Sequence, residues 1–228
     1  MPHADMFRTP PDASPSSRAH GWALGLGAIL MVLFMAMHPT VHAHNMRGLA
    51  DGIMSGATFN RTIHGTLMVL TFLILLGFAE LSNRLGWRQL PVLAAFVCYA
   101  AGWLAHLGAA AINGFMVPAL VEHMAEDRDA SLEHLSPILD FCHVANQALA
   151  QMGVVAICVA LVLWSAVLLT RAGGLRAVGI LGFICGGLPL FLLFAGRLPM
   201  DIHGFGGFVL ALSTWSIAVA VQLIHDRI

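Results

Sequence analysis

The chain has 228 residues, of which 58% are hydrophobic and 10% are charged, and its formal net charge is −1. Soluble domains carry about 25% charged residues, so this composition excludes an ordinary water-soluble domain and predicts an integral membrane protein. The near-neutral charge also argues against a nucleic-acid partner, which would require a basic face.

The first predicted element is a Pro- and Ser-rich segment, residues 1–20, which we expect to be disordered. Six apolar segments follow, each long enough to cross a hydrocarbon core of about 30 Å. They cover residues 21–38, 62–81, 90–116, 138–169, 175–196 and 203–224. The sequence therefore predicts one all-α domain, residues 21–228, built as a bundle of six transmembrane helices in contact with the lipid bilayer.

The first apolar segment has a second interpretation. Residues 21–43 resemble a signal peptide whose "VHA" would be a small-residue cleavage site. The segment before them is long and contains no Lys, and the apolar run is close to full span length. We therefore favour a retained span, although the sequence leaves cleavage open.

The arginines predict the orientation, because cytoplasmic loops of membrane proteins carry the excess of basic residues. With six spans, both termini lie on one side of the membrane. The arginines on that side are Arg8, Arg18, Arg84, Arg88, Arg171, Arg176 and Arg227, and those on the other side are Arg47, Arg61, Arg128 and Arg197. This distribution predicts cytoplasmic termini in a cell membrane, which would be the inner membrane in a bacterium.

The histidines gather on the predicted extracytoplasmic side. The nine on that side are His38, His42, His44, His64, His106, His123, His134, His143 and His203. Four of them come from different spans, namely His64, His106, His143 and His203. Ionisable groups at membrane depth usually face a bundle interior or a wet cavity, so we expect these four side chains to converge there.

Imidazole is the commonest metal ligand and suits copper, zinc, iron and nickel. The predicted site comprises His64, His106, His143, His203, Asp140, His42 and His44, and Asp201 is a further carboxylate nearby. Methionines near the same side favour copper over zinc, because soft thioethers select Cu(I). We expect His143 to matter more than any histidine of the "HPTVHAH" loop, because a helix holds a ligand more precisely than a loop does.

Two other functions remain open. His106 and His143 could be the axial ligands of a haem b that exchanges electrons with quinol, or the polar core could be structural in a non-catalytic scaffold. The four cysteines form no C-x-x-C motif, and we find no known catalytic signature. The sequence therefore leaves open whether the protein is an enzyme, whether a metal donor or quinol is its partner, and whether it forms a homo-oligomer.

Overall fold

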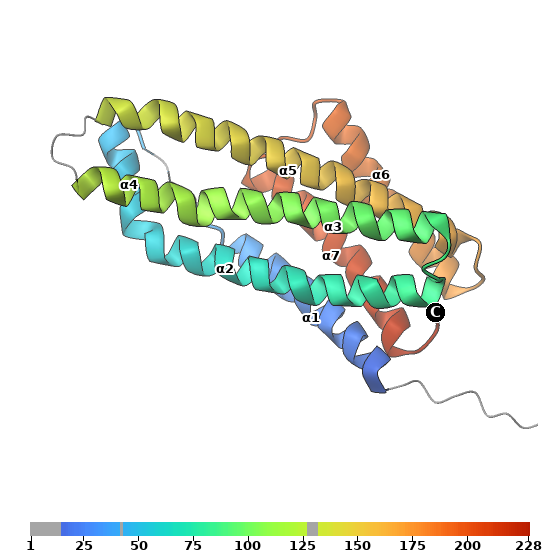
Figure 1. Ribbon diagram of the computed structural model, residues 1–228. Coiled ribbons are helices and arrows are strands. Elements are labelled where there is room, and N and C mark those ends of the chain that lie inside the picture. Colours follow the sequence, from blue (N-terminus) through green and yellow to red (C-terminus); the bar gives the residue numbers. More distant parts are fainter. Residues whose placement is uncertain (1–14, 42, 127–131) are drawn as a thin grey trace, which may run out of the picture.

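The computed structural model describes residues 15–41, 43–126 and 132–228, which form helices joined by linkers, with no strand among them. The elements are α1 (Pro15–Ala36), α2 (Met46–Leu85), α3 (Leu90–Ala111), the π-helical turn η1 (Ile112–Met116), α4 (Val117–Glu126), α5 (Leu132–Leu169), α6 (Gly174–Phe194) and α7 (Ile202–Ile224). Within the described ranges, six helical stretches are long and apolar enough to cross a membrane. This result confirms the predicted all-α bundle, drawn in Figure 1, and defines a multi-pass membrane protein.

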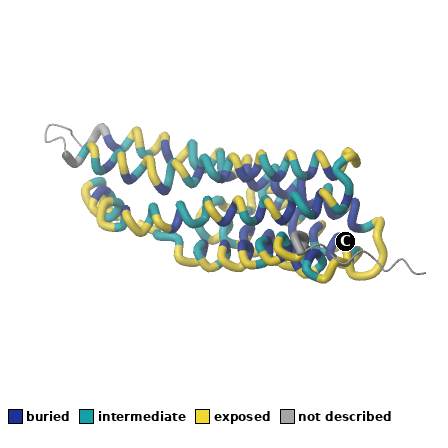
Figure 2. The backbone as a smooth tube through the Cα atoms, turned by 60° about the horizontal axis from the view of Figure 1, so that its bottom comes forward, coloured by how far each residue is buried: buried dark blue, intermediate teal, exposed yellow. Residues whose placement is uncertain are grey.

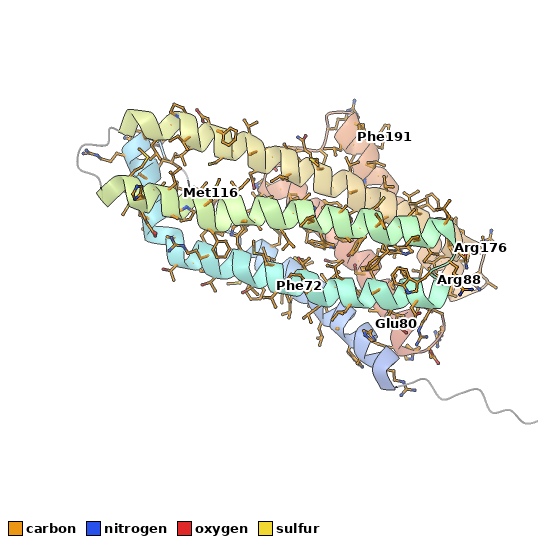
Figure 3. All side chains as sticks on the ribbon, in the orientation of Figure 1. Phe72, Glu80, Arg88, Met116, Arg176 and Phe191 are labelled. Atoms are coloured by element: carbon orange, nitrogen blue, oxygen red, sulfur yellow. The ribbon has the colours of Figure 1, made fainter. Side chains whose placement is uncertain are left out.

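The bundle has two distinct ends. The linkers 86–89 and 170–173 lie near the C-terminus, and we call this the terminal end (Figure 1). Arg88 and Arg176 both lie there, as Figure 3 shows. The linkers 37–45 and 195–201 join the spans at the opposite end, which we call the distal end. Of the segment predicted to be disordered, residues 15–20 are helical, and residues 1–14 lie outside the described ranges.

Three helices extend beyond the membrane-spanning length at the distal end. With 40 residues in α2 and 38 in α5, these helices measure about 60 and 57 Å at 1.5 Å per residue, about twice the hydrocarbon core. The third is α3, which continues through η1 into α4. The predicted limits at residues 62, 116 and 138 therefore mark the ends of the apolar stretches. They are not the ends of the helices, which continue through more polar residues.

This distal extension contains a small core of its own. Ala50, Val121 and Leu135 are buried against one another there. Arg61 of α2 also donates a hydrogen bond to the carboxylate of Glu122 in α4 at 2.6 Å. The contacts hold α2, α4 and α5 together outside the span, where Val41 of the linker after α1 lies close to Gly52 of α2.

The terminal half of the bundle is packed with aromatic side chains. Phe78 stacks on Trp164 and Trp215, with ring centroids 5.0 and 5.3 Å apart, and it also contacts Tyr99 at 4.5 Å. Buried positions lie on the inward faces of the helices, as Figure 2 shows. In contrast, Phe72 points away from the bundle (Figure 3) and is 57% exposed. The aromatic core thus closes the terminal half, whereas the distal half contains a cavity.

Candidate functional site

A cavity of about 610 Å³ lies in the distal half of the bundle. Residues of α1, α2, α3, η1, α5 and α7 line it, together with residues of the linkers 37–45 and 195–201. We call it the distal cavity. A neighbouring cavity of about 320 Å³ shares five lining residues with it, namely Pro39, Val41, Asn113, His143 and Asn146. Among the described residues, Asp201 is the only Asp, Glu, Lys or Arg in the wall of the distal cavity. The described wall is therefore polar, with one formally charged side chain besides its histidines.

Two imidazole rings meet in the wall of this cavity. The Nε2 atom of His38, in the linker after α1, lies 3.2 Å from the Nε2 atom of His64 in α2. Each ring also uses its other nitrogen. Nδ1 of His64 lies 2.9 Å from the carbonyl oxygen of Asn60, and Nδ1 of His38 lies 3.1 Å from that of Pro39. Because a carbonyl oxygen only accepts hydrogen bonds, both Nδ1 atoms must carry the proton.

The proton count leaves the Nε2 contact incomplete. A neutral imidazole has a single N–H group, so two rings that both donate from Nδ1 face each other with bare Nε2 lone pairs. A second proton on His38 would complete the contact, but burial and the nearby His64 ring lower the pKa of His38 to about 4. At neutral pH the two lone pairs therefore point at the same small space without a hydrogen between them.

This geometry matches one edge of a tetrahedral metal site. Metal–nitrogen bonds of about 2.0–2.1 Å place two imidazole nitrogens of one tetrahedral ion about 3.3 Å apart, close to the observed 3.2 Å. Imidazoles that bind metals usually donate their other N–H group to a carbonyl or carboxylate, which fixes the ring and its tautomer. His38 and His64 both have such a carbonyl partner.

Thioethers line the same cavity. Met31 and Met35 of α1, Met68 of α2 and Met200 before α7 account for four of the twelve methionines in the chain. Met31 and Met35 are one turn apart and buried, and Met68 follows His64 by one turn. A soft sulfur ligand of Cu(I) is therefore available beside the imidazole pair.

Glycine and asparagine residues hold the His64 ring in place. Gly114, in the π-helical turn η1, packs so closely on the His64 ring that a Cβ atom at this position would overlap it. Asn60 Nδ2 donates to the carbonyl oxygen of Asn113 at 2.8 Å, which ties α2 to η1. π-Helical turns inside α-helices are frequent at functional sites. Here the turn presents a backbone without a side chain to His64.

His106 is buried deeper in the same cavity without a hydrogen-bond partner. It is 7% exposed, and neither ring nitrogen has a partner among the described residues. The indole N–H group of Trp103, which is 6% exposed, likewise has none. A buried unsatisfied polar group costs about 1–3 kcal/mol. His106 and Trp103 of the cavity wall therefore carry buried polar atoms without a hydrogen-bond partner, and the nitrogen edge of the His106 ring is packed against Gly153 of α5.

The predicted site residues are only partly brought together. His64, His106 and His143 line the distal cavity, although His143 itself is exposed. His203, Asp140 and His44 are exposed and lie outside the cavity wall, and His42 lies outside the described residues. The carboxylate of Asp201 accepts from the backbone N–H groups of His203 and Gly204 and so caps α7.

The register of α3 and α5 separates the two histidines predicted as haem ligands. His106 of α3 lies against Gly153 of α5, and Gly108 lies against Leu149. His143 of α5 therefore lies opposite about residue 114, in η1, which continues α3. This position is about eight residues from His106, or about 12 Å at 1.5 Å per residue. The arrangement does not favour a haem held between His106 and His143.

His38 and three methionines are the residues that sequence reasoning missed. The methionines had a signal in the helical spacings "M-x3-M" from Met31 to Met35 and "H-x3-M" from His64 to Met68, which put these side chains on one face of α1 and one face of α2. The predicted site draws only on methionines near the distal surface. His38 lies in the linker after α1, as the "HPTVHAH" loop predicts, but the predicted site does not include it.

Within the described ranges, no group of three or more His, Cys, Asp or Glu side chains is placed to share one ion. A metal in this cavity would therefore take two imidazoles and complete its shell with sulfur or water.

No family model, curated protein or solved structure matches the chain. The fold and cavity define a six-span membrane protein with a polar distal cavity, and its function rests on the chemistry of that cavity.

Proposed function

We propose that this multi-pass membrane protein binds one Cu(I) ion between His38 and His64 and takes part in copper handling. The observation that carries the proposal is the pair of Nε2 atoms 3.2 Å apart, each on a ring anchored to a carbonyl through Nδ1. A methionine thioether from the cavity wall would be the third ligand. Sulfur favours Cu(I) over zinc, which usually takes nitrogen, thiolate or carboxylate ligands.

Metal handling fits the site better than metal-dependent catalysis does. In the part of the cavity wall that the structure describes, Asp201 is the single carboxylate, and that group caps α7. A general acid or base is therefore not available beside the ion other than the histidines themselves. A site of two imidazoles and thioethers, open to a cavity, has the ligand set that suits capture and release of a soft ion.

The proposal is tested by titrating the detergent-purified protein with Cu(I) without oxygen, against a chelator of known affinity. We expect one equivalent of Cu(I) to bind, with two nitrogen ligands and at least one sulfur ligand in its X-ray absorption spectrum. Stoichiometric zinc without Cu(I) would contradict the choice of metal. Absence of both metals would favour the scaffold alternative, and a Soret band in the purified protein would favour haem.

We also propose that the copper site faces the extracytoplasmic side. The seven arginines predicted on the side of the termini, against four on the other, support this orientation. A reporter that is active only outside the cytoplasm should stay inactive when fused after Ile228. The same reporter inserted between residues 127 and 131, in the linker before α5, should be active. The reverse pattern would put the copper site on the cytoplasmic side.

A further inference from the structure

We propose that Met68 is the sulfur ligand of the copper site, and that the resulting set of two imidazoles and one thioether selects soft monovalent ions. This inference rests on the proposed function and deepens it, because it names the third ligand and the class of ion, Cu(I) or Ag(I). Its evidence is the register of α1 and α2, the packing of the cavity methionines and the charge of the cavity wall.

The two segments that carry the imidazole pair run antiparallel. α1 ends at the distal end of the bundle, whereas α2 begins there. Gly27 of α1 lies against Ile74 of α2. His38 is eleven residues beyond Gly27, and its partner His64 is ten residues before Ile74. The register of the two helices therefore continues up to the imidazole pair, and it places the methionines of both helices on the terminal side of that pair.

The direction of the side chains separates these methionines. Side chains on a helix lean towards its N-terminus. The N-terminus of α2 is at the distal end, so Met68 leans towards His64, which lies one turn before it with Cβ atoms about 5–6 Å apart. The N-terminus of α1 is at the terminal end, so Met35 leans away from His38. The unbranched, flexible side chain of methionine adapts its reach, and Met68 is the better placed of the two.

The packing of the cavity methionines agrees with this assignment. Met31 and Met35 are buried in the main hydrophobic core, at 4% and 8% exposure, and Met200 packs against the same core. Met68 lines the cavity and is half-buried, and it belongs to neither hydrophobic cluster of the described residues. The Met68 side chain can therefore shift towards an ion without opening the core.

The charge of the cavity wall favours a monovalent ion. Imidazole and thioether are neutral ligands, so a bound ion keeps its full charge, and Asp201, the single carboxylate in the described wall, caps α7. The cost of removing an ion from water rises with the square of its charge, so a divalent ion costs about four times as much as a monovalent ion of the same size. Zn(II) would lack the thiolate or carboxylate that compensates this cost elsewhere.

Met68→Leu tests the assignment of the ligand, and Met35→Leu is its matched control. Exchange of methionine for leucine is well tolerated in apolar surroundings and removes the sulfur. We expect Met68→Leu to lower Cu(I) affinity at least about tenfold, the lower end of the loss for a residue that orients a metal ligand. Its X-ray absorption spectrum should lose the sulfur ligand and keep two nitrogen ligands. Met35→Leu should keep both the affinity and the sulfur.

A complementary variant leaves Met68 as the single methionine in the described cavity wall. In this variant Met31, Met35 and Met200 are all replaced by leucine, and we expect it to bind Cu(I) with two nitrogen ligands and one sulfur ligand. Sulfur retained in Met68→Leu, or absent from the triple variant, would overturn the assignment and leave the His38–His64 pair as the copper site. Monodispersity and thermal stability check the fold of each variant.

Competition between ions tests the selectivity in the wild-type protein. Ag(I) should bind in one equivalent and displace Cu(I), whereas an equal concentration of Zn(II) should displace neither ion. Displacement of bound Cu(I) by equimolar Zn(II) would overturn the preference for monovalent ions although the copper site itself would stand. A wild-type protein that binds no Cu(I) would overturn the proposed function and this inference together.

Discussion

Replacement of either His38 or His64 by alanine should abolish stoichiometric Cu(I) binding. Each variant leaves a single imidazole where the proposed site has two nitrogens 3.2 Å apart. Loss of a residue that only orients a ligand lowers metal affinity about 10–100-fold, so loss of a ligand should cost at least about 100-fold. Competition titration of Cu(I) in the purified variants measures this change.

The matched controls for this experiment are His44→Ala and His143→Ala. His44 belongs to the same histidine-rich linker as His38 but is exposed, and His143 lines the cavity with an exposed side chain. Both variants should keep one equivalent of Cu(I) with little change in affinity. The opposite pattern, in which His143→Ala loses the metal and His38→Ala retains it, would support the helix-centred site expected from the sequence.

Gly114→Ala should lower Cu(I) affinity although residue 114 contributes no ligand. The new Cβ atom would overlap the His64 side chain, so the ring must rotate or the π-helical turn must shift. Either movement separates the two Nε2 atoms that the proposed ion bridges. We expect a loss of about 10–100-fold, comparable to the loss of a residue that orients a metal ligand, in the same competition titration.

Gly56→Ala is the control for this second prediction. Gly56 lies in α2, as His64 does, but a Cβ atom there would meet nothing within 4 Å. Its Cu(I) affinity should match that of the wild type. If Gly114→Ala also binds Cu(I) normally, then the position of the His64 ring is not critical and the proposed pairing is wrong.

The membrane-spanning architecture could be predicted from the sequence because hydropathy is a local property. An apolar stretch of span length has few alternatives in a bilayer, where the backbone must satisfy its own hydrogen bonds. The six apolar stretches with few charged residues are therefore the six candidate spans. The ends of α2, α4 and α5 were not predictable in this way, because these helices continue outside the apolar stretch and are held by contacts such as Arg61–Glu122.

The candidate site could be predicted only in part. The sequence indicated that histidines from different helices share one end of the bundle, and His64, His106 and His143 do line one cavity. It could not indicate which rings touch. The contact between His38 and His64 depends on how the linker after α1 folds back onto α2, and helix periodicity does not describe that path.

The sequence by itself therefore determined the class of protein, the number of spans and the shared end of the bundle for His64, His106 and His143, since these depend on composition and on the order of apolar segments. The tertiary structure alone decided which side chains contact one another. It paired His38 with His64, left His106 and Trp103 without hydrogen bonds in a cavity, and put Asp201 to use as a helix cap. The physical reason is that the hydrophobicity of a segment is the sum over its own residues. Hydrogen bonds and metal ligation instead require particular atoms from distant segments to lie within a few ångströms of one another.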